Sequence, residues 1–169
     1  MNKLLFWYHK YLNPRISIGK NVRIGNGTVF DLPLWTPFVD GKRERVPIEG
    51  GISIGNNVDI GGNNTIVLGC IRPTRIDNDV WVAHGNMIGH GCQIGRGTII
   101  VSKVALNGLV EIGEWCFIAS GVTIQPEIKI GEYSMIGTDS NVTRDIPPYS
   151  IAYGNPCRRI RENKWRPPL

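Results

Sequence analysis

The chain has 169 residues, a net charge of +5 and 20% charged residues, which is typical of a single globular domain. No apolar run approaches the roughly 20 residues that span a bilayer, and the cluster from Leu4 to Tyr8 is too short for a signal-peptide core. These features argue against a transmembrane segment and predict a soluble, cytoplasmic protein. The four cysteines contain no CxxC pair, which favours buried or unused thiols.

Residues 1–15 are expected to form a capping helix. Apolar residues recur at helical spacing between Leu4 and Leu12, and Asn13 and Pro14 end the pattern. The helix would cover the open end of the repeats that follow, because an exposed sheet edge recruits other chains. Docking of this segment on a membrane surface is the less favoured alternative.

A hexapeptide repeat organises residues 16–154. From Ile76 to Val142 an aliphatic residue occupies every sixth position. This period fits neither a helix nor a simple alternating strand, and it predicts an all-β fold, a parallel β-helix in which three hexads make one triangular coil. Glycine often follows the aliphatic residue, where corners are expected to need backbone freedom. A small or β-branched residue four places on, such as Cys92 or Cys116, is a second inward position.

Two irregularities interrupt the repeat. The insertion loop at residues 31–51 is rich in proline and aromatic residues, among them Trp35, and is expected either to bind substrate or to cover a neighbouring subunit. Between Ile66 and Ile76 the spacing is ten, so four extra residues should bulge out around Cys70 to Thr74. Counting of coils predicts that this bulge lies beside the corner that carries His84.

Only three histidines are present, so candidates for a neutral-pH general base are few: His9, His84 and His90. His84 is third in its hexad, at an outward corner between small residues, although spacing alone favours an ordinary surface histidine. His90 occupies the same position in the next hexad, on the adjacent edge. It could approach the His84 of a neighbouring subunit, but a surface role is the better supported reading.

Two segments carry a resemblance to a known family. The run Val82-Ala83-His84 with Ile88-Gly89 is similar to the segment of the lipid A acyltransferases that holds their catalytic base. Residues 142–161 resemble the closing motif of the small sugar, serine and sialic-acid-type acetyltransferases. Over residues 16–161 the chain resembles the left-handed β-helix hexapeptide acyltransferases. That resemblance implies a homotrimer with active sites between subunits, an acyl-CoA or acyl carrier protein donor, and His84 as general base without a metal.

The same resemblance implies further site residues. Ser102, one coil beyond His84, matches the glycine whose backbone N–H forms the oxyanion hole, and is assigned with His84 to catalysis. The donor, acetyl-CoA, is expected to contact Lys103, Ser120, Arg144, Arg158 and Arg159. The sugar acceptor is expected to contact Trp35, Asn64, Asn86 and His90.

One residue departs from the family pattern, and one turn matches it. Relatives often have a carboxylate after the histidine, whereas this chain has Gly85, so a backbone carbonyl or one of three aspartates would have to orient the ring: Asp59, Asp77 or Asp79. Gly154-Asn155-Pro156 marks a turn into a C-terminal helix and tail, residues 155–169, with the helix at about Cys157 to Trp165.

The sequence favours an acetyl-CoA-dependent acyltransferase acting on an amino or hydroxyl group of a nucleotide-linked sugar, in surface polysaccharide or lipopolysaccharide biosynthesis. A long-chain lipid A type activity is less favoured, since no uridine-binding N-terminal domain is present. A decayed, structural or regulatory trimer is a further alternative, motivated by Gly85. The γ-type carbonic anhydrases need three zinc-bound histidines that these hexads do not offer, and no aromatic platform accompanies the C-terminal basic run, which argues against a nucleic acid partner.

Overall fold

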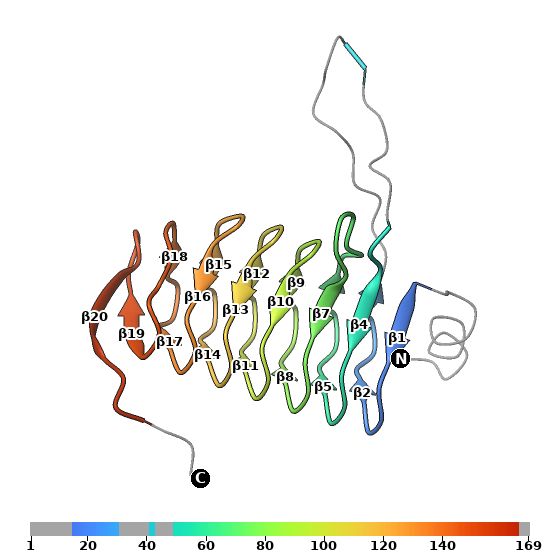
Figure 1. Cartoon of the computed structure of the whole chain (residues 1–169), viewed down its shortest axis with the longest axis horizontal. Helices are drawn as coiled ribbons and strands as arrows, with labels where there is room; N and C mark the ends of the chain where they lie inside the picture. Colours follow the sequence, from blue (N-terminus) through green and yellow to red (C-terminus); the bar gives the residue numbers. More distant parts are fainter. Residues whose placement is uncertain (1–14, 31–40, 43–48, 166–169) are drawn as a thin grey trace.

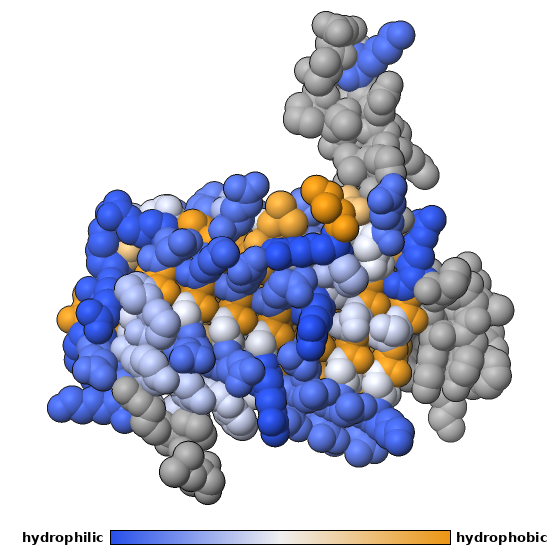
Figure 2. Space-filling view, viewed as in Figure 1, coloured by the Kyte–Doolittle hydropathy of each residue, from blue (hydrophilic) through white to orange (hydrophobic). Residues whose placement is uncertain are grey.

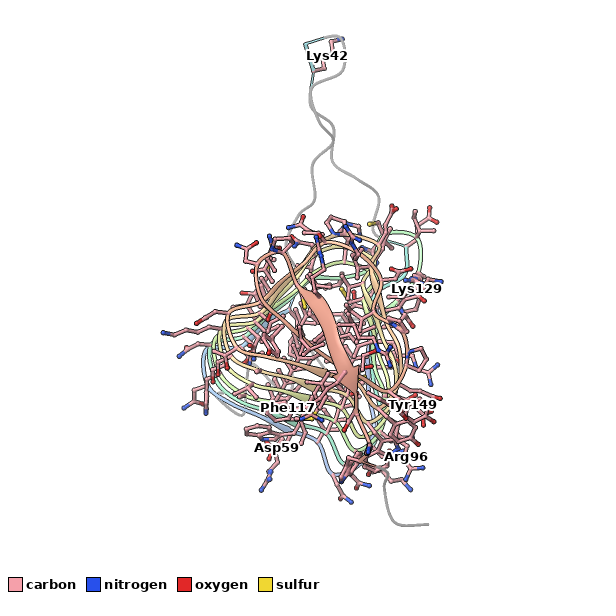
Figure 3. All side chains as sticks on the ribbon, turned by 90° about the vertical axis from the view of Figure 1, so that its left-hand side faces the viewer. Lys42, Asp59, Arg96, Phe117, Lys129 and Tyr149 are labelled. Carbon is pink, nitrogen blue, oxygen red and sulfur yellow. The ribbon has the colours of Figure 1, made fainter. Side chains whose placement is uncertain are left out.

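The computed structural model describes residues 15–30, 41–42 and 49–165, and in these ranges every regular element is a β-strand. Short strands follow one another around three faces of a prism that is triangular in cross-section (Figure 1, Figure 3). Each face is crossed once per coil, so, as far as β18, strands three apart in the chain pair in parallel. The parallel β-helix predicted from the hexad period is therefore confirmed.

Three sheets make up the faces. Sheet A contains β1 (Ile16–Ile18), β4 (Ile52–Ile54), β7 (Thr74–Ile76), β10 (Gln93–Ile94), β13 (Glu111–Ile112) and β16 (Lys129–Ile130). Sheet B contains β2 (Arg23–Ile24), β5 (Asp59–Ile60), β8 (Trp81–Val82), β11 (Ile99–Ile100), β14 (Phe117–Ile118), β17 (Met135–Ile136), β19 (Ser150–Tyr153) and β20 (Arg158–Glu162). Sheet C contains β3 (Val29–Phe30), β6 (Thr65–Ile66), β9 (Met87–Ile88), β12 (Ala105–Leu106), β15 (Thr123–Ile124) and β18 (Asn141–Val142). The corners between them form the AB, BC and CA edges.

The core is a stack of side chains from the two inward positions of each hexad. Aliphatic residues such as Ile76, Ile88 and Ile100 are fully buried, and the second inward position holds residues such as Cys92 and Cys116, also buried. Register links each residue to its equivalent one coil away, as Ile94 pairs with Ile76. Burial of each such isoleucine stabilises the fold by roughly 1.5–3 kcal/mol, so coils support one another through a continuous column.

The corner glycines were expected to supply backbone freedom, but the structure gives them another role. A Cβ on Gly55 would lie 2.6 Å from Asn78 Oδ1, and one on Gly95 would lie 2.6 Å from the Gly113 carbonyl carbon. Left-handed backbone occurs instead two residues after such a glycine, as at Asn57, where φ is 56°. These glycines therefore permit close stacking of successive corners, and the positive φ is adopted by other residues.

The bulge lies on a different edge from the one predicted. The extra residues separate β6 of sheet C from β7 of sheet A, so they protrude at the CA edge. There Arg72 donates hydrogen bonds to the carbonyls of Gly91 (2.9 Å) and Leu109 (3.2 Å). The neighbour of the bulge is consequently the corner of His90, whereas His84 lies on the BC edge.

The predicted C-terminal helix is wrong within the described residues, because residues 158–162 form strand β20. This strand pairs antiparallel with β19 and so satisfies the backbone groups at the last edge of sheet B, which a helix would leave unpaired. The predicted N-terminal helix lies outside the described residues apart from Arg15, a turn residue. Of the insertion loop, only residues 41–42 and 49–51 are described.

The three faces differ in chemistry. Sheet A turns charged and polar side chains outward, and Figure 2 shows bands of hydrophilic residues across the face toward the viewer. Sheet B turns outward a column of large apolar residues, namely Trp81, Ile99, Phe117 and Met135. Sheet C turns outward mostly small or neutral residues, namely Thr65, Met87, Ala105 and Thr123. Figure 3 places Lys129 of sheet A and Phe117 of sheet B on separate sides.

In the described part of the chain no helix could cross a membrane.

Candidate active site

Three of the predicted site residues form a column on the BC edge. Ser102 lies one coil above His84, as the hydrogen bond from Lys103 N–H to the His84 carbonyl (3.2 Å) shows. Ser120 follows in the next coil, since Gly121 N–H donates to the Ser102 carbonyl at 3.1 Å. His84 is exposed, and the two serines are half-buried. Adjacent coils are about 4.8 Å apart, so one small group could contact His84 and Ser102 together.

His84 caps the corner of the coil below. The backbone N–H of Gly62 donates to its Nδ1 at 2.9 Å. Asn56 and Asn78 make the same contact on the AB edge, where each side-chain oxygen accepts from a backbone N–H one coil below at 2.7 Å. All three residues are third in their hexads. In this respect His84 follows a general rule of the scaffold.

The contact also fixes the protonation pattern of the ring. A neutral imidazole carries one proton, so an Nδ1 that accepts a hydrogen bond requires the proton to be on Nε2. The outward-facing nitrogen is then a donor. A base acting through Nε2 needs the opposite tautomer.

None of the aspartates considered from the sequence orients the ring. Asp59 pairs with Arg23, and Asp77 pairs with Arg75 at 3.1 Å. Asp79 accepts from Asn57 (3.0 Å) and from Arg96 (2.9 Å), and these hydrogen bonds, that of Asn57 first, lower the pKa of its carboxyl. Asp59 lies on sheet B and the other two lie on the AB edge, and all three are already paired. The orienting group is instead the Gly62 N–H.

Ser102 presents a free backbone donor above His84. Its carbonyl accepts from Gly121, whereas its N–H has no hydrogen-bond partner in the part of the chain that the structure describes. Lys103 follows it, exposed, with a left-handed φ of 61°. The edge therefore offers an imidazole, an unpaired amide donor and a cation within two coils.

Asn64 and Asn86 lie inside the prism, which corrects their assignment to the acceptor site. They are 0% and 3% exposed. Asn64 accepts from the Asn86 N–H (2.8 Å) and donates to the carbonyls of Gly61 and Ala83 (both 2.8 Å). Asn86 accepts from the Val104 N–H at 2.8 Å, while its Nδ2 has no partner among the described residues. An inward amide satisfies backbone groups at a corner, so this ladder supports the BC edge from within.

The remaining predicted residues lie elsewhere. His90 is on the CA edge, where its Nδ1 lies 3.3 Å from Cys70 Sγ. Arg144 is exposed after β18, also on the way from sheet C to sheet A, and Arg158 and Arg159 are exposed on β20. Trp35 lies outside the described residues. The structure thus brings together His84, Ser102, Lys103 and Ser120. It leaves His90, Arg144, Arg158 and Arg159 apart from them.

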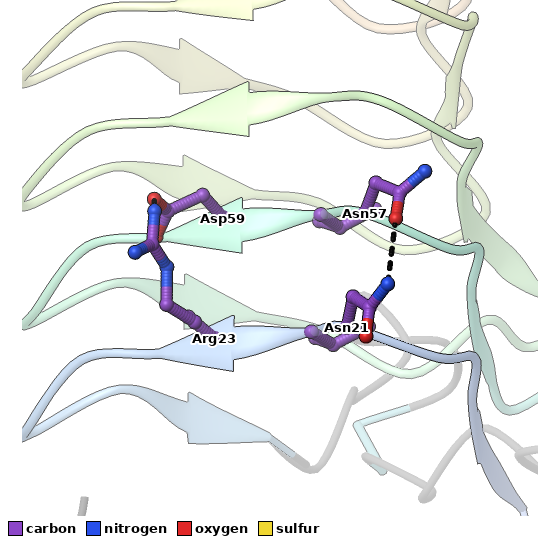
Figure 4. Close-up of a pocket in the computed structure, with 6 residues that line it drawn as sticks. Asn21, Arg23, Asn57 and Asp59 are labelled. Carbon is purple, nitrogen blue, oxygen red and sulfur yellow. Dashed lines mark hydrogen bonds and ion pairs between the residues drawn. The ribbon is translucent and has the colours of Figure 1, made fainter.

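The Ser102 N–H was expected from the family resemblance. Sequence reasoning missed the Gly62 N–H, although the third-position pattern of Asn56 and Asn78 was a signal for it. A shallow hollow at the N-terminal end of sheet B is separate from it. There Asn21 donates to Asn57 at 3.1 Å and Arg23 pairs with Asp59 (Figure 4). Within residues 15–30, 41–42 and 49–165 no group of three or more His, Cys, Asp or Glu side chains could hold a metal ion.

Comparisons with known proteins agree with this architecture. No protein-family model matches the chain. It is 32% identical over 160 residues to the UDP-3-O-acylglucosamine N-acyltransferase of Methylorubrum populi, covering 90% of the chain and 42% of that protein. The chain thus spans less than half the length of this curated relative.

Two solved structures share the fold. The UDP-N-acetylglucosamine acyltransferase of Campylobacter jejuni superposes with a TM-score of 0.73 at 26% identity, covering 88% of this chain and 64% of that one. PerB of Caulobacter crescentus, in complex with CoA and GDP-perosamine, superposes with a TM-score of 0.67 at 21% identity, covering 83% and 57%. By its hexad repeat, its three parallel sheets and these relationships, the chain is similar to the left-handed β-helix hexapeptide-repeat acyltransferases.

Proposed function

We propose that the chain transfers an acyl group from a thioester donor to an amino or hydroxyl group of a nucleotide-linked sugar, in the biosynthesis of lipopolysaccharide or surface polysaccharide. The names of the relatives support the reaction class and the kind of acceptor. A protein of the same fold binds CoA and GDP-perosamine, which supports acetyl-CoA as the donor. Donors and acceptors of this kind are made in the cytoplasm, so we propose that location too.

One observation carries the proposal: an exposed imidazole and an unpaired backbone N–H lie on consecutive coils of one edge. In the proposed reaction His84 takes the proton of the attacking amine or hydroxyl. The acceptor attacks the thioester carbon, and the Ser102 N–H donates to the oxyanion that develops. The thiolate of the donor then leaves, and no covalent enzyme intermediate is needed.

The Gly62 contact sets a condition on this chemistry. Nε2 can accept a proton only when the ring carries its own proton on Nδ1, and that state cannot accept from the Gly62 N–H. We therefore propose that the His84–Gly62 hydrogen bond opens when the acceptor binds. Relaxation of the cap would be part of each turnover.

The donor is proposed to lie along the BC edge, past Lys103 and Ser120, with a phosphate near the cationic side chain of Lys103.

The apolar and neutral faces B and C flank this edge, and this favours a homotrimer whose subunits meet there. Replacement of Phe117 by Lys on sheet B should convert a trimer to smaller species in light scattering. The matched change Gln93→Lys on sheet A should leave the assembly intact, and equal behaviour of the two variants would refute this placement.

The test is release of free thiol from acetyl-CoA across a panel of amino and hydroxy nucleotide sugars, with His84→Ala and His84→Asn beside the wild type. Asparagine can keep the Gly62 cap, as Asn56 and Asn78 do, but cannot accept a proton at neutral pH. We expect both variants to lose activity by about 10²-fold or more, while only His84→Ala loses stability, by about 1 kcal/mol. Full activity of His84→Asn would reject the base role.

A second candidate is a non-catalytic trimer, favoured by the equivalence of His84 with Asn56 and Asn78 as corner caps. It predicts no thiol release with any donor and no loss of stability in His84→Asn.

Acyl length is tested in the same assay by long-chain acyl carrier protein donors.

A further inference from the structure

A thiol and an imidazole face each other on the CA edge, away from His84. Cys70 Sγ lies 3.3 Å from His90 Nδ1. Cys70 is 8% exposed, and His90 is half-buried. Within this distance the thiol proton can pass to the ring, and the resulting thiolate and imidazolium stabilise each other.

The other three thiols lack such a partner. Cys92 donates to the Asn107 carbonyl (3.1 Å) and Cys116 to the Gly131 carbonyl (3.2 Å), and a carbonyl does not accept the proton outright. Burial raises the pKa of both thiols to about 12. Burial also raises the pKa of Cys157, which is fully buried at the far end. Cys92 and Cys116 occupy the second inward position of their hexads, and Cys157 joins the core between β19 and β20, whereas Cys70 belongs to the bulge.

Local packing holds the pair in place. A Cβ on Gly108 would collide with the imidazole of His90, so the ring rests on a corner that only glycine leaves open. Arg72 ties the bulge to the next two coils through the Gly91 and Leu109 carbonyls and through Glu111 at 2.8 Å. Among the described residues, Arg72 and Glu111 bring a paired cation and anion to the coils that carry the pair. Glu49 adds only its backbone N–H, which donates to the Cys70 carbonyl at 3.1 Å.

We propose that Cys70 is a nucleophilic thiol activated by His90, and that it reacts with low-molecular-weight disulfides. The thiol proton passes to Nδ1 of His90, and Cys70 Sγ attacks one sulfur of the disulfide. The old S–S bond breaks as the new one forms, and the leaving thiolate takes the proton from His90. One thiol and one disulfide give one thiol and one mixed disulfide, so the step is balanced. The small exposed fraction of Cys70 limits the reaction to small partners.

Dithiodipyridine is a suitable probe, because each thiol that reacts releases one chromophore. In the native protein we expect one of these four thiols to react fast, and peptide mapping to place the label on Cys70. Cys70→Ser should abolish the fast phase. Cys116→Ser, whose hydroxyl can make the same bond to the Gly131 carbonyl, is the matched control and should keep it.

His90→Gln tests activation as distinct from exposure. We expect it to slow the Cys70 reaction at neutral pH by about tenfold or more and to make the rate climb steeply with pH. The wild type should stay fast toward lower pH. A label on another cysteine, four thiols that react only on unfolding, or a pH profile unchanged in His90→Gln would each overturn the proposal. Peptide mapping of the wild type decides the site even if a variant fails to fold. The result is independent of acyl transfer, which takes place on the BC edge.

Discussion

The internal asparagine ladder gives a sharp quantitative test of the fold at the BC edge. Asn64→Ala removes three side-chain hydrogen bonds from a fully buried position. At about 1 kcal/mol each their loss should destabilise the protein by about 3 kcal/mol, beyond the effect of the cavity. Asn86→Ala removes one such bond, to Val104, together with an Nδ2 that has no partner in the described part of the chain.

Because the two substitutions delete the same atoms from equally buried sites, the cavity terms cancel approximately. Asn64→Ala should therefore be the more destabilising by about 2 kcal/mol. Urea unfolding followed by circular dichroism measures the difference. Since a repeat array can unfold in stages, amide exchange at the BC edge serves as a second readout. Equal effects of the two substitutions, or a larger effect of Asn86→Ala, would refute the hydrogen-bond assignment.

Two further predictions concern charge and stacking. Hydrogen bonding from Arg72 lowers the pKa of Glu111 below its usual 4.5, so the pair stabilises the fold above that pH and its contribution is lost as the pH falls below it. Glu111→Gln should accordingly flatten the acid side of a plot of melting temperature against pH, and an unchanged acid limb would contradict the pairing. Gly95→Ala should destabilise by roughly 1–3 kcal/mol, since its Cβ would press on the next coil. Gly85 has open space around it and only a positive φ, so Gly85→Ala should lower the free energy of unfolding by about 1 kcal/mol. If Gly85→Ala lowers the melting temperature more than Gly95→Ala does, the stacking argument is contradicted.

The regular part of the fold was predictable because its cause is periodic. An aliphatic residue at every sixth position implies a corner every six residues, and coil counting then places Ser102 above His84 and His90 on the adjacent edge. Those placements are confirmed by the pairing of β12 with β9 and by the order of the sheets. Burial of Cys92 and Cys116 follows from the same count.

What could not be predicted depends on single contacts between coils. The tautomer of His84 depends on its single contact with the Gly62 N–H. The bulge lies between sheets C and A by the coil count itself, so its predicted place beside His84 was a counting error, and Arg72 only ties it to the next coils. The C-terminal segment has a turn signal at Gly154, but whether a strand or a helix follows depends on the open edge of sheet B that it covers. The inward place of Asn64 and Asn86, four residues after Ile60 and Val82, does follow from the hexad count, but their polarity led to their assignment to the acceptor site.

The most direct test of the central claim compares the wild type with His84→Asn in acyl transfer from acetyl-CoA to the best acceptor of the panel, at matched folded fraction. We predict that the variant unfolds at the same urea concentration as the wild type, because the cap to Gly62 is kept, yet transfers acyl groups at least about 10²-fold more slowly. Transfer by His84→Asn at the wild-type rate would contradict it and leave His84 as a corner cap alone.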